Sequence, residues 1–254
     1  MAQIISIVNQ KGGVGKTTTA VNIAAYLAAF GKTVLLVDLD PQANATSAFN
    51  IDHRALGQGI YEVLLGQTTA GRVTLDTRLK GLRLLPATAA LAGAAIELVE
   101  LPRREYRLAD ALLEARESYD FVLIDCPPSL GLLTVNGLVA SDQVLIPVQA
   151  EYFALEGLGQ LVETVMLVRD NLKPNLDVLG AVITMFDKRN SLSEAVMRDL
   201  YEFFPNRIFR TVVPRNVRLA EAPSHGKTIL EYDSGSSGAR AYERLSRELL
   251  GFEV

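Results

Sequence analysis

Asn9-Gln10-Lys11-Gly12-Gly13-Val14-Gly15-Lys16-Thr17-Thr18 is the most informative stretch of this 254-residue chain. An apolar run, 4–8, precedes it, and a run with helical spacing, 19–29, follows it. A glycine-rich loop between a strand and a helix lets backbone N–H groups and the helix N-terminus bind a phosphate group. The pattern predicts that Lys16 reaches the β- and γ-phosphates of a nucleotide and that the Thr17 hydroxyl binds Mg²⁺.

Two other interpretations of this loop fit less well. A dinucleotide fingerprint could begin at Gly13, with Asp38 holding a ribose, but Thr18 stands where its third glycine belongs and Lys16 is left unexplained. The plain phosphate-loop pattern also fails once, because its first glycine would fall at Gln10. Lys11 is a second lysine, at the front of the loop, which a plain phosphate loop does not need.

Length and composition bound the class of protein. With 254 residues, 49% of them hydrophobic, and no evident linker or repeat, we expect one globular domain over residues 1–254. The net charge of −4 argues against a general nucleic-acid binder, so any DNA contact needs a local basic patch. The chain has one cysteine and no apolar run of about 18 residues, and it starts without a basic leader. We therefore expect a cytoplasmic protein without a membrane partner.

Short apolar runs alternate with helical patterns. Strands are predicted at 4–8, 34–37, 121–124, 144–148 and 178–183, and weaker ones at 82–85 and 208–213. Helical spacing marks 19–29, with Gly31 as its end, and also 108–115, 158–168 and 238–250. Ser191 with Glu194 predicts a capping box before one further helix. The alternation predicts an α/β fold, a doubly wound and mostly parallel sheet with helices on both faces.

Acidic residues follow two of these strands. Asp38-Leu39-Asp40-Pro41 ends the second strand, and Asp125 ends the run 121–124. We expect Asp40 to orient or activate a water near the γ-phosphate, Asp38 to help hold Mg²⁺ through water, and Asp125 to be a second Mg²⁺-site acid. Cys126 is interpreted as a small buried residue, not a nucleophile. His53 and His225 stand alone, so no zinc site is expected.

The last third of the chain carries scattered basic residues among acids, a pattern typical of a solvated surface. Its final helix places Leu245, Leu249 and Leu250 on one side, and we expect this narrow apolar stripe to pack on the core.

Taken together, these motifs resemble the deviant Walker A ATPases of the ParA/MinD family, most closely the chromosomal ParA proteins of the Soj type. The resemblance covers the loop, 38–42 and 122–128, and extends to 146–149, 152–157, 214–219 and 221–227. It therefore spans essentially the whole chain. Since the loop begins within ten residues of Met1, the N-terminal helix-turn-helix region of larger plasmid ParA proteins is expected to be absent.

The resemblance implies a P-loop NTPase that uses ATP and Mg²⁺. It implies catalytic roles for Lys11, Lys16, Asp40 and Asp125. The implied nucleotide contacts are Lys11, Gly12, Gly13, Val14, Gly15, Lys16, Thr17 and Thr18, with Pro214 and Asn216 at the adenine. The implied metal ligands are Thr17 directly, and Asp38, Asp40 and Asp125 through water.

The resemblance also implies partners. Lys11 would reach the phosphates of a second protomer in an ATP-bound homodimer, and Gly12 would lie where the two protomers come close. Arg189 and Arg218 would bind double-stranded DNA without sequence preference, at the nucleoid. A ParB-type centromere-binding protein would stimulate hydrolysis and release the DNA, which makes the implied function chromosome or plasmid partition. The alternative is a membrane-associated positioning ATPase of the MinD type, which the lack of a basic C-terminal extension disfavours.

Overall fold

A central sheet organises the molecule. The computed structural model describes residues 1–151 and 154–251, and within them seven strands form one sheet in the order β3-β4-β2-β5-β1-β6-β7. All neighbouring strands are parallel except the short pair β3–β4. The strands are β1 (Gln3–Ile7), β2 (Val34–Asp38), β3 (Leu75–Asp76), β4 (Leu82–Leu85), β5 (Phe121–Asp125), β6 (Gln143–Gln149) and β7 (Asp177–Thr184). This confirms the doubly wound, mostly parallel sheet.

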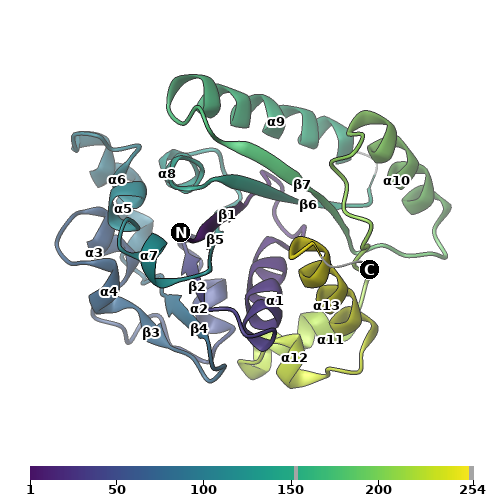
Figure 1. Cartoon of the computed structure of the whole chain (residues 1–254), viewed down its shortest axis with the longest axis horizontal. Helices are drawn as coiled ribbons and strands as arrows, with labels where there is room; N and C mark the ends of the chain where they lie inside the picture. The colour runs from purple at the N-terminus through teal and green to yellow at the C-terminus, as the bar shows by residue number, and fades with distance from the viewer. Residues whose placement is uncertain (152–153, 252–254) are drawn as a thin grey trace.

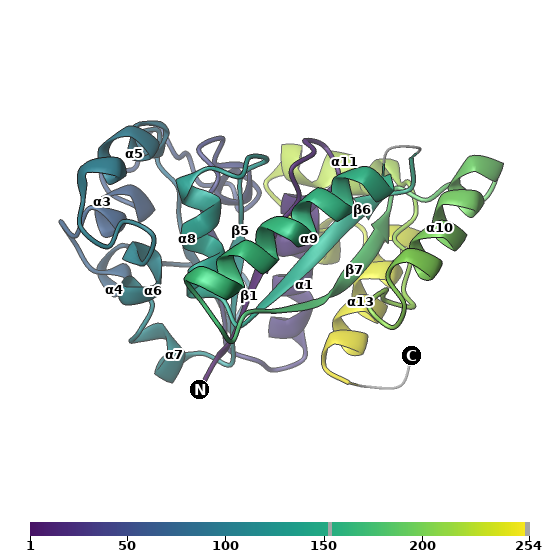
Figure 2. The same cartoon turned by 90° about the horizontal axis from the view of Figure 1, so that it is seen from above.

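Helices cover both faces of the sheet. Figures 1 and 2 show α1 and α13 on one face and α8 and α9 on the other. The longer helices are α1 (Lys16–Ala29), α8 (Leu132–Ala140), α9 (Ala154–Asn171), α10 (Ser191–Phe203) and α13 (Ser237–Leu249). The shorter ones are α2 (Asn44–Ser47), α3 (Ile60–Leu64), α4 (Ala70–Val73), α5 (Leu91–Glu97), η1 (Leu98–Glu100), α6 (Arg107–Ala111), α7 (Ala115–Ser118), α11 (Val217–Glu221), η2 (Ala222–His225) and α12 (Ile229–Tyr232).

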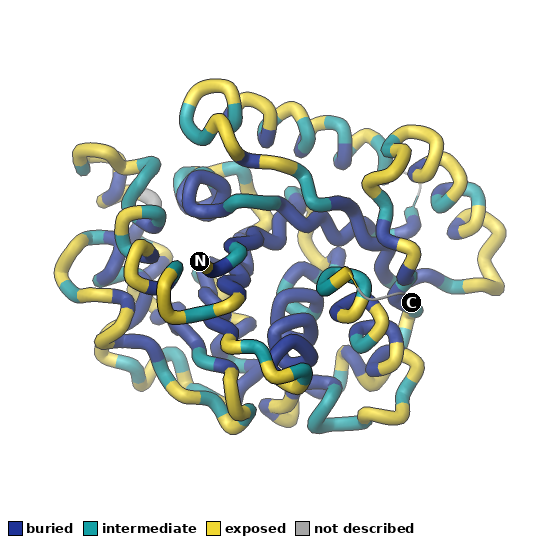
Figure 3. Tube along the Cα trace, in the orientation of Figure 1, coloured by how far each residue is buried: buried dark blue, intermediate teal, exposed yellow. Residues whose placement is uncertain are grey.

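The core consists of two apolar layers separated by the sheet. Successive residues of one strand enter opposite layers, because side chains alternate across a strand. Ile4 packs in the layer under α8 and α9, whereas Ile5 packs with Ile23 of α1 and Leu245 of α13. Every residue of β2 and β5 is buried, as Figure 3 shows for the centre of the sheet. The near-continuous apolar runs of the sequence therefore correspond to strands covered on both sides.

One predicted strand is wrong. Residues 208–213 form no strand: they make one isolated bridge to β7, Ala181 with Ile208, and the next bridge, Phe186 with Pro214, lies just beyond both segments. Between those bridges the N–H groups of Arg210 and Thr211 donate to the Glu248 carboxylate at 2.6 and 3.0 Å. Because α13 takes these donors, the segment cannot form a continuous ladder.

Two details of the helices also differ from the prediction. Asn190 is the N-cap of α10, since its side chain accepts the Leu192 N–H, so Ser191 is the first helical residue and does not form the predicted capping box. The pattern at 108–115 is divided into the two short helices α6 and α7. The end of α1 follows the prediction: Gly31 has a φ of 83° and donates its N–H to the Ala28 carbonyl.

Candidate functional site

The predicted site residues converge where three central strands end. Because β2, β5 and β1 are adjacent and parallel, Asp38 lies opposite Asp125, and Asp125 lies opposite Ile7, just before the glycine loop. This edge is where ligands bind in open parallel α/β sheets. The register alone therefore brings the loop and the strand-end acids together.

The loop is held by residues outside it. Gly13 and Gly15 have φ values of 79° and 90°, a left-handed conformation that favours glycine. The Asn9 amide donates to the Pro147 carbonyl at 2.7 Å, and its oxygen accepts the Lys11 N–H at 2.9 Å. From β7, the Thr184 hydroxyl donates to the Val14 carbonyl at 2.8 Å. Strands β6 and β7 therefore fix the loop that β1 carries.

The two lysines of the loop point to different places. The Lys16 side chain is buried, and its ammonium donates to the Lys11 carbonyl at 3.1 Å, across the loop. Burial lowers the pKa of Lys16, and the charges of Asp125 and Asp40 oppose that shift. The Lys11 side chain is 51% exposed and pairs with Glu151, which follows β6, at 2.5 Å. Lys16 is thus placed for a phosphate in its own loop, and Lys11 is not.

Asp38 is fully buried and accepts hydrogen bonds on both carboxylate oxygens. Its Oδ2 accepts from the Thr46 N–H and the Thr46 hydroxyl, both at 2.7 Å, and its Oδ1 accepts the Asp40 N–H at 3.3 Å. Burial raises the pKa of Asp38 to about 6, although the hydrogen bonds from Thr46 oppose the shift. The nearby charge of Asp40 adds to it.

Asp125 is the least compensated charge of the site. It is fully buried, and neither carboxylate oxygen has a hydrogen-bond partner of normal geometry among the described residues. Burial and the charge of Asp38 raise the pKa of Asp125 well above its ordinary value, although the nearby Thr17 hydroxyl opposes this. Asp40 is nearly buried as well, and its Oδ1 accepts the Gln42 N–H at 2.9 Å.

Asp40 and Asp125 each keep a carboxylate oxygen without a hydrogen-bond partner among the described residues, although no group of three His, Cys, Asp or Glu there is spaced to hold a metal by itself. Mg²⁺ prefers oxygen ligands and keeps several waters, so it binds through one or two carboxylates together with phosphate oxygens. An uncompensated buried carboxylate is costly unless a cation faces it. The residues present therefore suit a magnesium–nucleotide ligand.

Comparisons with known proteins agree with this geometry. A family model described as an AAA domain matches residues 2–178. The sporulation initiation inhibitor protein Soj of Bacillus subtilis is 51% identical over 98% of both chains. The chromosome partitioning protein ParA of Caulobacter vibrioides is 48% identical over 99% of this chain and 95% of that protein. The chain belongs to the ParA/Soj family of chromosome-partitioning ATPases.

Solved structures of similar fold carry nucleotides. Cobyrinic acid a,c-diamide synthase from Mycobacterium smegmatis, with an ATP analogue and magnesium bound, is 38% identical with a TM-score of 0.87, covering 98% of this chain and 95% of that one. The septum site-determining protein MinD of Pyrococcus horikoshii is 24% identical with a TM-score of 0.80, covering 98% and 96%. At that identity the likeness to MinD concerns the fold alone.

The other residues predicted to contact the nucleotide come from several parts of this ParA-family chain. Thr17 and Thr18 line a cavity of about 430 Å³ between α1, α2 and the α11–η2 segment. Pro214 pairs with Phe186, two residues beyond the Thr184 that contacts the loop, and so lies near its other side. Asn216 caps α11 and donates to the Ser237 hydroxyl at 2.7 Å. Neither Pro214 nor Asn216 lines the cavity itself.

The two predicted DNA-binding arginines lie on the surface, apart from the loop. Arg189 is highly exposed and its guanidinium holds the Asp187 carboxylate with bonds of 3.0 and 2.8 Å. Arg218 pairs with Glu221 at 2.9 Å and with Asp233 at 3.6 Å. Both arginines are therefore already partly neutralised within the chain.

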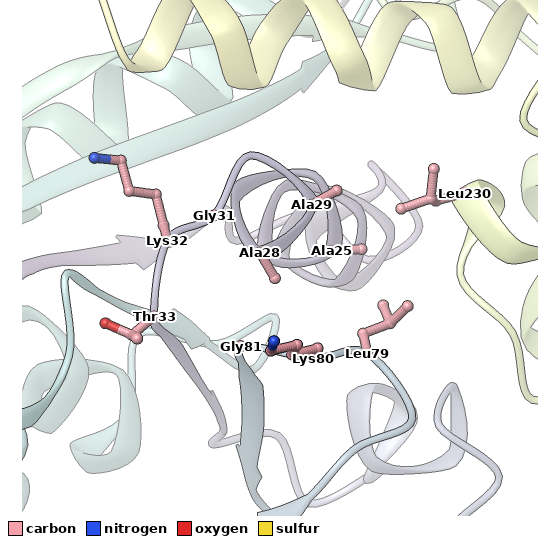
Figure 4. Close-up of a pocket in the computed structure, with 10 residues that line it drawn as sticks. All are labelled: Ala25, Ala28, Ala29, Gly31, Lys32, Thr33, Leu79, Lys80, Gly81 and Leu230. Carbon is pink, nitrogen blue, oxygen red and sulfur yellow. The ribbon is translucent and has the colours of Figure 1, made fainter.

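A larger hollow, about 570 Å³, lies away from the loop. It is bounded by the end of α1 and by the residues that precede β2 and β4, so it sits at the opposite ends of the strands. Figure 4 shows Ala25, Leu79 and Leu230 gathered beside α1, while the Lys32 ammonium points away. Its lining includes none of the residues predicted to contact the nucleotide.

Other predictions from sequence can now be judged. Cys126 is fully buried and burial raises the pKa of its thiol, which agrees with a structural role. Of the predicted stripe on the last helix, Leu245 is fully buried in the layer that contains α1, and Leu249 and Leu250 are partly buried against that layer, so the stripe packs on the core as predicted. Among the described residues no helix is long and apolar enough to cross a bilayer. Residues 152–153 of the family motif, and 252–254, lie outside the described part.

Four residues of the site escaped the sequence interpretation. Asn9, Thr46, Glu151 and Thr184 all hold a site residue through the hydrogen bonds and ion pair given above. Glu151 and Thr184 stand at the carboxyl ends of β6 and β7, a position at which such residues could have been sought. Thr46 lies eight residues beyond Asp38, and no spacing rule points to it.

Proposed function

We propose that this chain is an ATP-dependent partitioning ATPase that binds Mg²⁺ and ATP and pairs face to face with a second copy when ATP is bound. Its single domain would span residues 1–254 and act in the cytoplasm, at the nucleoid. The nucleotide contacts are those of the loop, with Pro214 and Asn216 at the adenine.

The different directions of Lys16 and Lys11 carry this proposal. Lys16 already lies across its own loop, whereas the Lys11 ammonium is half exposed and, among the described residues, pairs with the half-exposed Glu151. A phosphate of a second protomer can attract Lys11 more strongly than an exposed carboxylate does, since a multiply charged anion offers more charge. Gly12 supports the same reading, because an added Cβ there meets no described atom within 4 Å. A need for glycine at this position would then come from the bound nucleotide or from a partner, and the proposed dimer supplies the partner.

Each site residue has a defined task in hydrolysis. The Thr17 hydroxyl would bind Mg²⁺ directly, and Asp38, Asp40 and Asp125 would hold its waters. When bound, Mg²⁺ would supply a Lewis acid that polarises the phosphoryl oxygens. Asp40 orients the attacking water, while Lys16 and the partner's Lys11 neutralise the charge that develops on the phosphates.

The remaining partners follow from pairing. Two copies would present two sets of Arg189 and Arg218 to one DNA duplex. The affinity for the phosphate backbone, and its dependence on salt, would then increase without any contact to the bases. A ParB-type protein would stimulate hydrolysis. Loss of the γ-phosphate would remove the anion that attracts the Lys11 ammonium to the other protomer, and the dimer would separate. The chromosome-partitioning names of the relatives support this cycle.

The decisive experiment separates binding from hydrolysis. Asp40→Ala keeps Lys16 and the loop, so with Mg²⁺ and ATP it should elute at twice the mass of one chain by size exclusion with light scattering and release no phosphate. Gly12→Val should stay at the mass of one chain, because its side chain obstructs the close approach.

A surface aspartate provides the control. Asp199→Ala changes an exposed acid on α10 and should match the wild type in mass and phosphate release. An Asp40→Ala protein that stays monomeric and releases phosphate at the wild-type rate would overturn the proposal.

A further inference from the structure

Thr46 is fully buried beneath the metal-site acids and uses all of its polar groups. Its N–H and its hydroxyl both donate to Asp38 Oδ2 at 2.7 Å. The same hydroxyl oxygen accepts the Ala87 N–H at 3.0 Å. A hydroxyl has one proton to give, so the Ala87 N–H leaves Asp38 as the only recipient of that proton.

The chain between the two aspartates and Thr46 is folded to permit this. The Ala43 N–H donates to the Asp40 carbonyl at 2.9 Å, and Ala43 has a φ of 52°, an uncommon conformation for alanine. This turn starts α2 and returns the chain beneath Asp38. The hydrogen bonds from Thr46 to Asp38 therefore close a loop that carries Asp38 and Asp40 together.

The loop after β4 anchors the arrangement from the other side. The Pro86 carbonyl accepts the Ile60 N–H at 2.9 Å, and a Cβ added to Gly59 would lie 2.5 Å from that carbonyl oxygen. The segment 86–88 is thus held tightly against the start of α3. Because the Ala87 N–H donates to Thr46, the Asp38 carboxylate is connected through Thr46 to this segment.

We propose that Thr46 is a positioning residue for the magnesium site, which fixes the Asp38 carboxylate and the turn bearing Asp40 against the loop after β4. The expected effect on catalysis rests on the proposed function. The hydrogen-bond relay, from the Ala87 N–H to the Thr46 hydroxyl and from that hydroxyl to Asp38, can be tested without nucleotide. Residues that orient metal-site carboxylates affect metal affinity and turnover by about 10- to 100-fold when removed.

The test compares Thr46→Val with Thr46→Ser. Valine keeps the shape and loses the hydroxyl, whereas serine keeps the hydroxyl and loses a methyl group. Thr46→Val should lower kcat about 10-fold and raise the Mg²⁺ concentration for half-maximal hydrolysis by a similar factor, with the KM for ATP at saturating Mg²⁺ little changed. Thr46→Ser should restore both values to near those of the wild type.

Thr88→Val is the matched control. Thr88 is buried and lies next to Ala87 in the segment 86–88. Its hydroxyl has no hydrogen-bond partner among the described residues, so replacing it by valine removes no hydrogen bond. It should leave kcat and the Mg²⁺ requirement unchanged.

Hydrogen exchange of the nucleotide-free chain supplies a readout that needs no hydrolysis. The Ala87 amide should exchange about 10-fold faster in Thr46→Val than in the wild type or Thr46→Ser, because its acceptor is gone. If Thr46→Val is poorly folded, Thr46→Cys against Thr46→Ser gives the same comparison, since a thiol is a weak donor.

Each failure has its own signature. A wild-type chain without Mg²⁺-dependent hydrolysis would overturn the proposed function, and Ala87 exchange would still decide the relay. A folded Thr46→Val protein with wild-type kcat and Mg²⁺ requirement would show that Thr46 is only structural. Unchanged Ala87 exchange in that variant would overturn the relay itself.

Discussion

The nucleotide site and the surface that carries Arg189 and Arg218 handle charge in opposite ways. At the site, Lys16 and the strand-end acids are buried, and both Asp125 oxygens lack partners among the described residues. On the surface, Arg189 is 88% exposed and hydrogen bonds from Arg189 lower the pKa of Asp187 to about 2. One region is incomplete without a ligand, and the other is already satisfied by its own chain.

This difference in charge compensation distinguishes the nucleotide site from the surface that carries Arg189 and Arg218. Burying charges without full compensation destabilises the fold, so such groups persist where a ligand completes them. Exposed ion pairs contribute little either way, since water screens them. The site acids are therefore suited to a ligand as they stand, whereas the surface arginines would have to leave their carboxylates to bind DNA as proposed.

The largest expected effect is at Lys16. Lys16→Ala removes the buried ammonium that lies across the loop, and should weaken Mg²⁺–ATP binding about 100-fold in isothermal titration. Lys32→Ala changes a lysine beside the hollow of Figure 4 and should bind as the wild type does. If both variants weaken Mg²⁺–ATP binding equally, the buried charge of Lys16 has no special role in the site.

The smallest expected effect is at the surface arginines. Arg189→Ala should lower the affinity of the ATP-bound protein for double-stranded DNA a few-fold and reduce the salt slope by about 1. Asp187→Asn should raise DNA affinity slightly, because it releases the Arg189 guanidinium. Both are measured by fluorescence anisotropy over a series of salt concentrations.

Another exposed pair serves as the comparison for that measurement. Asp170→Asn frees Arg169 on α9, which has no predicted DNA role, and should leave DNA affinity unchanged. If Asp170→Asn and Asp187→Asn act alike, general charge and not a defined patch governs DNA binding.

The sequence predicted the parts of the fold that repeat a simple physical pattern. Apolar runs buried on both faces located the five main strands, and the weaker run at 82–85 was also correct. The failure at 208–213 has a specific cause, because Glu248 of the distant α13 takes its backbone donors. Periodicity carries no information about such a long-range competitor.

The site divides in the same way. Lys16, Thr17, Asp38, Asp40 and Asp125 could be predicted because each stands at a loop or strand end with a recognisable pattern. Thr46 and Thr184 could not, since their contacts depend on how α2 and β7 approach the site in space. Arg189 and Asp187 are only two residues apart, yet the sequence does not indicate that the guanidinium forms two hydrogen bonds with the Asp187 carboxylate.

The most direct test of the cost of burying a site charge is the free energy of unfolding of the nucleotide-free chain at pH 7 and pH 5, for the wild type and Asp38→Asn. Burial raises the pKa of Asp38 from 3.8 to about 6, so protonation favours the folded state, and this stability is lost as pH rises through that range. The wild type should gain about 1 kcal/mol relative to Asp38→Asn between pH 7 and pH 5. Parallel pH dependence of the two proteins would contradict the account.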